Sequence, residues 1–412
     1  MTVPLAAYEG IVGSSAVTQL RRIGEKLSGA RVVHVNSTRE GGGVAEILEW
    51  MVPLMRDVGI DASWEVIHGD QRFFEITKSM HNGLQGKEVA LAAKDWRIYR
   101  DVNEKNMERL RPVLADADIV VIHDPQPAAL LGLCPERKGK WIWRAHIDIS
   151  RPFRPVWKFL RGIVGKYDAS IFSMCEFAQQ LPHDQFLIPP SIDPLSDKNR
   201  ELSREELAAT RAEFGLDPDR PLLVQVSRFD RFKDPIGVIL AYRLVRKVAP
   251  VQLVLAGGGA TDDPEGKAVL DDVMEAAESD PDIHVLLLPS GAHRTINTLQ
   301  RLADIVLQKS TREGFGLTVT EALWKGKPVI GGDVGGIRLQ VVNHHTGFLV
   351  NTPEGAAHRI RFLLHHSDMI RKLGDAGREF VRENFLLTRH LREYLTLFLA
   401  LRTGSGDRVL YV

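Results

Sequence analysis

Short apolar runs alternate with longer amphipathic stretches over almost the whole chain. Short runs rich in β-branched residues predict buried strands, and the amphipathic stretches between them predict helices. This alternation is typical of parallel sheets built from strand-helix units, so the sequence predicts an α/β protein with two such sheets. The expected strands cover residues 31–37, 62–68, 118–123, 141–146, 169–173 and 185–188, and then 222–227, 251–256, 284–288, 305–308, 328–331 and 347–350.

The two sets of strands are separated by residues 189–210, where closely spaced prolines are followed by charged residues. Proline and charge without an apolar period indicate a linker and a surface helix. We therefore expect an N-terminal domain over residues 1–195 and a C-terminal domain over residues 215–377. The strongly helical residues 378–402 are expected to cross back to the first domain, and residues 403–412 to form a flexible tail.

Composition and charge narrow the class of protein. The 412 residues are 44% hydrophobic and 26% charged, which is enough for two or three domains with full cores. The 53 Lys and Arg residues balance 53 Asp and Glu residues, so charge gives no reason to expect a nucleic-acid or membrane partner. There is no apolar run of the length that a spanning helix needs, and two cysteines fit a reducing compartment. We expect a cytoplasmic protein.

Three consecutive glycines, Gly41, Gly42 and Gly43, lie between the first expected strand and an expected helix over residues 46–55. Glycines let the backbone approach an anion closely, and a helix N-terminus presents unpaired N–H groups to it. The plain alternative is a tight turn. The stretch does not match the dinucleotide fingerprint G-x-G-x-x-G with a later acidic residue, so a nicotinamide cofactor is disfavoured.

A basic pair follows the first expected strand of the C-terminal domain. Arg228 and Lys233, after Ser227, flank a turn at the carboxyl end of that strand, where ligands of open α/β sheets bind. Two cations at this place would suit a pyrophosphate whose charge grows as a bond to it breaks. The alternative is a solvated charged loop.

An acidic pair, Glu313 and Glu321, flanks the expected start of another helix. The N–H groups of Gly316, Leu317 and Thr318 at that start would point at a phosphate. One carboxylate could then bind the hydroxyls of a sugar and the other those of a ribose. Taken alone, the pair could be a capping acid and a solvated helix acid. Together with the basic pair it predicts a nucleotide-sugar site.

The glycine-rich loop, R-x4-K and E-x7-E together resemble the retaining nucleotide-sugar glycosyltransferases of glycosyltransferase family four over nearly the whole chain. This resemblance implies the α/β fold called GT-B, in which two Rossmann-like parallel-sheet domains face a cleft and the second domain holds the donor. The implied donor-binding residues are Gly41, Gly42, Gly43, Ser227, Arg228, Lys233, Leu288, Glu313, Gly314, Phe315, Gly316, Leu317, Thr318 and Glu321.

Four stretches of the first domain, residues 73–78, 81–86, 123–127 and 143–148, are similar in combination to the glycosyltransferring trehalose synthases. That family joins glucose from a nucleoside-diphosphate glucose to free glucose, which gives α,α-1,1-linked trehalose. Fungal-type trehalose phosphorylases are similar in the same stretches, so the leaving group stays open between a nucleotide and phosphate. The expected partners are therefore these small sugars, and a homodimer stays open.

The same stretches hold a polar cluster with a tryptophan, which suits a hexose because hydroxyls need hydrogen-bond partners and the sugar face needs an apolar surface. His146 ends an expected strand, although a lone histidine is more often structural. The implied acceptor-binding residues are Asn82, Gln85, Asp124, Gln126, Trp143, Arg144, His146 and Asp148.

For a retaining transfer we expect front-face attack, in which the leaving phosphate takes the proton of the acceptor hydroxyl. Arg228, Lys233, Glu313 and His146 form the expected catalytic set, and a covalent intermediate on Glu313 is the alternative. No metal-ligand motif stands at a strand end, so we expect no cofactor and no required metal. Another transferase or an epimerase of the same fold, or a sugar-binding regulator, are the rival functions.

Overall fold

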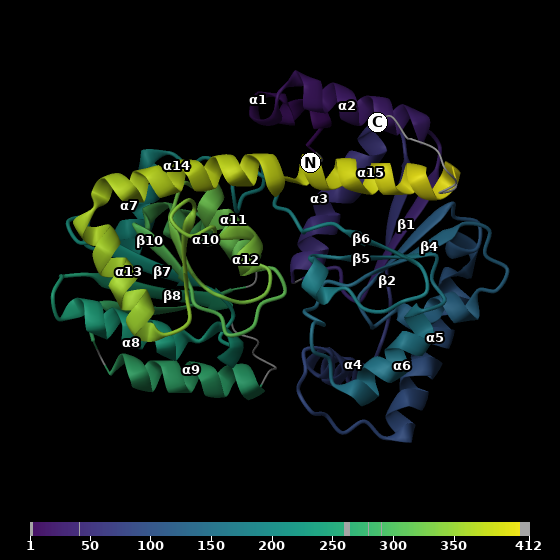
Figure 1. The fold of residues 1–412 in the computed structure, drawn as a ribbon, viewed down its shortest axis with the longest axis horizontal. Helices are drawn as coiled ribbons and strands as arrows, with labels where there is room; N and C mark the ends of the chain where they lie inside the picture. The colour runs from purple at the N-terminus through teal and green to yellow at the C-terminus, as the bar shows by residue number, and fades with distance from the viewer. Residues whose placement is uncertain (1–2, 41, 259–263, 279, 290, 404–412) are drawn as a thin grey trace. The chain divides into compact units, whose positions relative to one another are not determined.

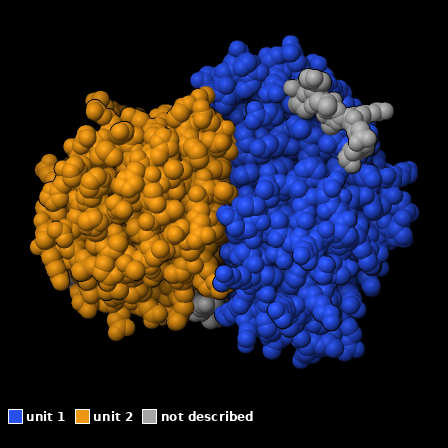
Figure 2. All heavy atoms as spheres, in the orientation of Figure 1, with its two compact units in different colours: residues 1–191, 387–412 blue, residues 192–386 orange. Residues whose placement is uncertain are grey.

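The computed structural model describes residues 3–40, 42–258, 264–278, 280–289 and 291–403. The chain divides into two compact units, which Figure 2 shows in different colours. Unit 1 comprises residues 1–191 and 387–412, and unit 2 comprises residues 192–386. Each unit holds one six-stranded parallel sheet, which confirms the predicted α/β class and its two sheets. No helix in the described part of the chain is long and apolar enough to cross a membrane.

The sheet of unit 1 has the strand order β2-β1-β3-β4-β5-β6. The chain passes from β1 to β2 on one side and then to β3 on the other, so the strand order reverses between β1 and β3. Ligands of such sheets bind outside the carboxyl ends of the strands at the point of reversal. The strands are β1 (Arg31–Asn36), β2 (Asp61–Val66), β3 (Ile119–His123), β4 (Lys140–Arg144), β5 (Ala169–Phe172) and β6 (Asp184–Leu187).

Two groups of helices cover this sheet (Figure 1). Helix α15 (Leu387–Thr403) packs on α2 (Ser14–Lys26) and α3 (Gly43–Asp57), so the last helix of the chain completes unit 1. Helix α4 (Gln71–Leu84) packs on α5 (Ala93–Leu114) and α6 (Arg154–Val164). The short elements are η1 (Leu5–Tyr8), α1 (Glu9–Val12), η2 (Ala128–Leu133) and η3 (Cys175–Phe177).

The sheet of unit 2 has the order β12-β11-β10-β7-β8-β9, and its strand order reverses between β7 and β10. Neighbouring strands pair in parallel throughout. The carboxyl ends of β7 and β10 are therefore the expected place for a ligand in this unit. The strands are β7 (Leu222–Val226), β8 (Gln252–Gly258), β9 (Ile283–Leu288), β10 (Ile305–Gln308), β11 (Val329–Gly332) and β12 (Gly347–Val350).

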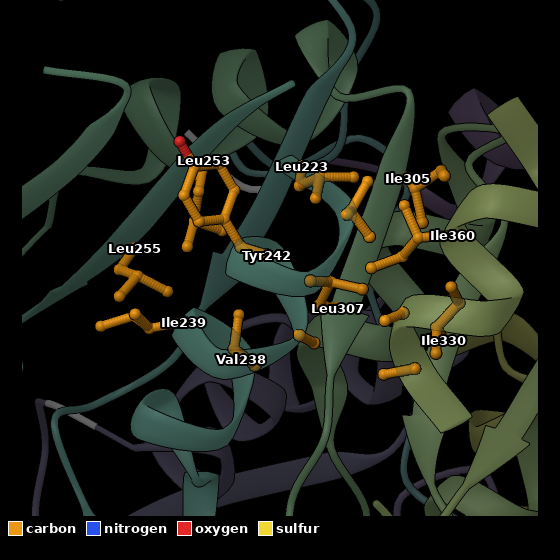
Figure 3. Close-up of a cluster of buried hydrophobic side chains, with 14 of the residues drawn as sticks. Leu223, Val238, Ile239, Tyr242, Leu253, Leu255, Ile305, Leu307, Ile330 and Ile360 are labelled. Atoms are coloured by element: carbon orange, nitrogen blue, oxygen red, sulfur yellow. The ribbon is translucent and has the colours of Figure 1, made fainter. Parts of the chain in front are cut away.

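The core of unit 2 fills the space between this sheet and two helices, α8 (Pro235–Arg246) and α13 (Pro353–His365), which pack on each other. Leu223 and Ile305 of the sheet belong to one buried cluster with Val238 and Tyr242 of α8 and Ile360 of α13 (Figure 3). The other elements are α7 (Arg204–Glu213), η4 (Arg231–Lys233), α9 (Pro264–Ala277), α10 (His293–Leu302), α11 (Leu317–Trp324), α12 (Ile337–Gln340) and α14 (Ser367–Asn384).

The unit boundaries differ from the predicted domain limits of 195, 215 and 377. The expected linker packs within unit 2, because the Nδ2 atom of Asn297 donates to the carbonyl oxygens of Asp197 (3.0 Å) and Arg200 (2.9 Å). The expected helix over residues 378–402 is in fact two helices. Helix α14 ends before Leu386, which forms a parallel bridge with Ile192, and α15 then returns to unit 1. Residues 404–412 of the expected tail lie outside the described residues.

Candidate active site

The basic pair of unit 2 lies where the sequence places it, directly after β7. Asp230 accepts a hydrogen bond from the backbone N–H of Phe232 (2.8 Å), which starts the turn η4 between the two cations. The side chain of Arg228 is 70% exposed, with its Nη2 atom 3.5 Å from the Oδ2 atom of Asp230. The side chain of Lys233 is only 17% exposed. Ser227, between the strand and Arg228, is half-buried.

Lys233 and Glu313 meet at the reversal point of the sheet. The Nζ atom of Lys233 lies 2.5 Å from the Oε2 atom of Glu313, whose side chain is 10% exposed. The Oγ atom of Ser310 donates to the same oxygen at 3.2 Å. Because Ser310 and Glu313 follow β10 and Lys233 follows β7, the paired strands hold the predicted basic and acidic motifs together within unit 2.

The backbone of residues 313–316 is held by a close approach that the sequence does not reveal. A Cβ atom at Gly335 would lie 1.8 Å from the carbonyl oxygen of Glu313, and one at Gly336 would lie 2.4 Å from the Cα atom of Phe315. The Nε2 atom of Gln340 donates to the carbonyl oxygen of Phe315 at 2.6 Å. The paired glycines after an expected strand are the signal that could have indicated this loop.

Helix α11 begins where the acidic motif predicts a helix start. Gly316, with φ +85°, precedes the first helical residue, Leu317. The first N–H groups of the helix lack acceptors within it, so they can bind an anion. The Oγ1 atom of Thr318 donates to the Oε1 atom of Gln308 (3.2 Å), which anchors this turn on β10. Gly314 and Leu317 are half-buried, Phe315 is buried, and Leu288 is 8% exposed at the end of β9.

Glu321 lies in α11, as the sequence predicts, but its side chain is more buried than expected. Its side chain is fully buried in α11, and its Oε1 atom lies 3.4 Å from the Nζ atom of Lys198, which is 13% exposed. The expected contact with a ribose requires an accessible carboxylate. The buried position beside Lys198 differs from the accessible one that this contact needs, and the role of Glu321 in ribose binding stays a prediction.

A second buried cation near the basic motif was not predicted. Lys309, 6% exposed, follows β10 and forms an ion pair with Asp234. Asp234 adopts a left-handed conformation (φ +48°) and accepts a hydrogen bond from the N–H of Gly237 (3.1 Å), which caps α8. This contact ties the end of β10 to the residue that follows Lys233. It joins positions far apart in the sequence, so no local pattern indicates it.

The glycine turn of unit 1 leads directly into a helix, as predicted. Gly42 has φ +83° and precedes Gly43, the first residue of α3. The first turn of α3 thus offers unpaired N–H groups at the carboxyl end of β1. Gly41 lies outside the described residues.

Asp124 and His146 form the polar centre of unit 1. Asp124 follows β3 in a left-handed conformation (φ +64°), and its Oδ1 atom accepts a hydrogen bond from the backbone N–H of His146 at 2.8 Å. Burial raises the pKa of Asp124 to about 7. The Nε2 atom of His146 lies 2.9 Å from the Nδ1 atom of His123, and the ring is half-buried. Two predicted residues, from the ends of β3 and β4, are therefore joined.

Trp143 and Arg144 are not at the surface of unit 1, in contrast to the predicted acceptor site. Trp143 is 1% exposed, and its Nε1 atom donates to the carbonyl oxygen of Asp124 at 3.0 Å. Arg144 is fully buried, and burial lowers the pKa of its guanidinium. Both residues lie on β4, a central strand between β3 and β5, and as neighbours in a strand they point to opposite faces of the sheet, where both side chains are buried. The stacking surface expected from Trp143 is absent.

The remaining predicted acceptor residues are spread over unit 1. Asn82 lies in the last turn of α4, and Gln85 follows that helix. Gln126 is half-buried. The Oδ1 atom of Asp148 accepts hydrogen bonds from the backbone N–H and the Oγ atom of Ser150, at 3.0 and 2.6 Å. No hydrogen bond among the described residues joins Asn82 or Gln85 to the other predicted acceptor residues.

Within the described ranges, no group of three His, Cys, Asp or Glu side chains is placed to hold a metal ion. The charged groups that the structure gathers at the reversal point of unit 2 are Lys233, Lys309, Asp234 and Glu313. What the arrangement offers an anion in unit 2 is therefore cationic side chains and backbone N–H groups.

Comparison with known proteins decides the family. The family described as "Trehalose synthase, N-terminal domain" matches residues 34–179, and "Glycosyl transferases group 1" matches residues 208–380. The "Trehalose synthase" of Thermococcus litoralis is 49% identical over 95% of this chain and 96% of its own length. The chain belongs to the trehalose synthase family. Its members are GT-B glycosyltransferases, and the activity is a trehalose-related glycosyl transfer.

More distant proteins extend this relationship. A "Trehalose phosphorylase" of Pleurotus pulmonarius is 28% identical over 98% of this chain and 62% of its own length. A UDP-forming α,α-trehalose-phosphate synthase of Burkholderia xenovorans has a similar structure, with a TM-score of 0.74 and 15% identity, covering 91% of this chain and 100% of that one. At 15% identity this similarity shows only that the two proteins share a fold.

Proposed function

We propose that this chain transfers glucose, with retention of configuration, from a nucleoside-diphosphate glucose to free glucose and so forms α,α-1,1-linked trehalose. The relatives named trehalose synthase support the product. The observation that carries the proposal is the contact of Lys233 with Glu313. It sets a cation suited to a leaving diphosphate beside a carboxylate suited to sugar hydroxyls, at the strand ends where this fold binds ligands.

In this proposal, the side chains of unit 2 stabilise the charge that develops on the leaving group. Arg228 and Lys233 donate charge-assisted hydrogen bonds to the diphosphate, and the first N–H groups of α11 bind its oxygens. Glu313 orients Lys233 and accepts a hydrogen bond from a hydroxyl of the transferred glucose. These cations replace the divalent metal that other phosphate sites use, so the reaction needs none.

The bond changes of the transfer balance without a further reactant. The bond between the anomeric carbon and the diphosphate oxygen breaks, while the bond from that carbon to the acceptor hydroxyl oxygen forms on the same face. The acceptor proton passes to the leaving diphosphate oxygen. In unit 1, Asp148 and His146 bind the hydroxyls of the acceptor glucose, because both are half-buried polar groups near the carboxyl ends of its strands.

A second candidate function is phosphorolysis of trehalose, in which inorganic phosphate takes the place of the nucleotide. The similarity to a trehalose phosphorylase over 98% of this chain favours it. Arg228 and Lys233 would bind phosphate by the same charge-assisted hydrogen bonds. The two candidates thus differ in the group bonded to the anomeric carbon besides glucose, a nucleoside diphosphate or phosphate, and trehalose is the product of the first and the substrate of the second.

A product assay separates these candidates. The protein is incubated with glucose and UDP-, ADP- or GDP-glucose in excess chelator, and in parallel with trehalose and inorganic phosphate. The proposal expects trehalose from at least one nucleotide donor, at a rate that the chelator leaves unchanged. Glucose 1-phosphate from trehalose and phosphate alone would assign the phosphorylase activity. Binding of sugars without turnover in any arm would point to a regulator.

A further inference from the structure

Three histidines form a continuous chain through unit 1. His34 lies in β1, His123 ends β3, and His146 follows β4. The Nδ1 atom of His34 is 3.0 Å from the Nε2 atom of His123, whose Nδ1 atom is 2.9 Å from the Nε2 atom of His146. The ring planes are inclined by only 29° and 19°, which fits in-plane N–H···N hydrogen bonds. The rings follow one another in series and do not converge on a point, so they form a relay and no metal site.

The surroundings keep all three rings neutral. Burial lowers the pKa of His34 to about 3 and the pKa values of His123 and His146 well below the usual value. The buried cation of Arg144 adds to this for the last two. No carboxylate among the described residues hydrogen-bonds to any of the rings, since Asp124 accepts from the backbone of His146. Each neutral ring has one N–H group.

Helix α15 completes the surroundings with a fourth histidine and a phenol. His390, also neutral because burial lowers its pKa, has its Nδ1 atom 2.8 Å from the Oγ atom of Ser191. The ring of Tyr394 packs against that of His34, with centroids 5.9 Å apart, and burial raises the pKa of Tyr394. Both groups are uncharged at neutral pH, so they do not force a proton onto the relay.

The two ends of the relay are unequal. Because each ring has one N–H group, both hydrogen bonds form only when all three N–H groups point the same way along the chain. If they point inward, the Nε2 atom of His34 carries a proton, and that atom is buried without a hydrogen-bond partner among the residues that the structure describes. If they point outward, His34 keeps a bare lone pair there and the last N–H group lies on the half-buried His146. Buried N–H groups without an acceptor are rare, so the outward direction is favoured.

We infer that His34 and His123 are positioning residues that hold His146 as the tautomer protonated on Nδ1. His146 then donates a hydrogen bond from Nδ1 to a hydroxyl oxygen of a ligand and does not act as a base. A base at Nδ1 would require the whole relay to reverse and leave an unpaired N–H group inside the core. That the ligand is a sugar rests on the proposed function, whereas the tautomer rests on the geometry alone.

The direct test is the tautomer of His146 in the free protein. Nitrogen NMR of the full chain labelled on the histidine rings distinguishes a protonated from an unprotonated ring nitrogen. The spectrum of His146→Gln assigns the signals, because those of residue 146 disappear. We expect a protonated Nδ1 and an unprotonated Nε2 at neutral pH. A proton on Nε2 alone, or on both nitrogens, would overturn the inference.

Two substitutions of His34 test its positioning role. In His34→Asn the amide nitrogen can donate from the place of Nδ1, whereas His34→Leu removes the donor. We expect His34→Asn to keep the tautomer and the KM for glucose. His34→Leu should mix the two tautomers and raise that KM about twofold for an even mixture, because only the fraction protonated on Nδ1 can donate, with the KM for the nucleotide donor unchanged. An unaltered tautomer and KM in His34→Leu would contradict the role.

The outcome also separates this inference from the proposed function. The expected tautomer in a protein that makes no trehalose would leave the relay standing and refute the function. Should His34→Leu not fold, the wild-type and His34→Asn spectra still decide the tautomer. Trehalose synthesis with His146 protonated on Nε2 would refute the relay and leave the function standing.

Discussion

The Nζ atom of Lys233 lies 2.5 Å from the Oε2 atom of Glu313, although 80 residues separate the two along the chain. Parallel pairing of β7 with β10 brings them together, and the hydrogen bond from Ser310 orients the carboxylate. The contact joins the basic motif that contains Lys233 and the acidic motif that contains Glu313, which lie far apart in the sequence, into one site. It also fixes Lys233, while the nearby Arg228 remains exposed.

Lys233→Ala should lower turnover about 10²–10³-fold, the effect of removing one preorganised donor from a developing negative charge. The measurement is kcat for trehalose formation under saturating substrates. Arg231→Ala is the matched control, since Arg231 lies in the same short helix η4 with its side chain 69% exposed. Equal losses in the two variants would show that Lys233 has no special place in the reaction.

Gly336→Ala should lower turnover about 100-fold, although residue 336 is not proposed to contact a ligand. The new Cβ atom would lie 2.4 Å from the Cα atom of Phe315, so the backbone that positions Glu313 must move, and small displacements of reacting groups cost that much. Gly162→Ala in α6 is the control, because its Cβ atom would have no neighbour within 4 Å in the described part of the chain. Steady-state kinetics with circular dichroism as a folding check tests this. Full activity in Gly336→Ala would contradict the claim that the backbone of residues 313–316 positions Glu313 for the reaction.

Asp148→Ala should raise the KM for glucose about tenfold, with the affinity for the nucleotide donor unchanged. Ser150 engages the Oδ1 atom of Asp148 twice, which leaves its other oxygen for a sugar hydroxyl. Asp101→Ala, at an exposed position on α5, is the control. Titration of glucose and nucleotide separately against each variant is the measurement. Loss of nucleotide affinity with glucose affinity intact would place the acceptor site elsewhere.

The buried histidines should make the protein less stable in mild acid. His34, His123, His146 and His390 have pKa values lowered by burial, so below pH about 6.5 the unfolded chain binds protons that the folded one does not. Each lowers the free energy of unfolding by about 1.4 kcal/mol per pH unit as the pH falls from about 6.5 towards its folded pKa. Asp124, with its pKa raised to about 7, acts in the opposite direction and offsets about one of them.

The dependence of stability on pH is tested by denaturant unfolding of the wild type and of His34→Asn between about pH 4 and 7. This range covers the pH values below the ordinary histidine pKa of about 6.5. The stability of the variant should depend less steeply on pH, by the contribution of one histidine. His68→Asn replaces a histidine whose ring has no part in the relay and serves as the control. Identical slopes in all three proteins would mean that His34 is not held neutral by the fold.

The fold was largely readable from the sequence. All predicted strands are present with ends that differ by at most two residues, because strands of a parallel sheet are buried on both faces and stand out as apolar runs. The break between α14 and α15 was not readable. The apolar pattern continues through Phe385 and Leu386, and the helix ends there because Leu386 pairs with Ile192, a contact between distant segments.

The candidate site was readable only in part. The place of Lys233 and Glu313 follows from strand ends, which local patterns locate. The burial of Trp143 and Glu321 depends on which face of their strand or helix the rest of the fold covers. Each residue belongs to a polar motif, and a polar motif by itself suggests an accessible side chain. The relay from His34 to His146 joins three strands, so no spacing along the chain indicates it.

The central claim is tested most directly by following the reaction of a nucleoside-diphosphate glucose with glucose by proton NMR. Both the nucleoside diphosphate and the anomeric protons of the product are visible in one sample. The account predicts one α,α-1,1-linked trehalose for each nucleoside diphosphate released, with retention at the transferred carbon. A product with a β-linked glucose, or trehalose that appears only when glucose 1-phosphate replaces the nucleotide donor, would contradict it.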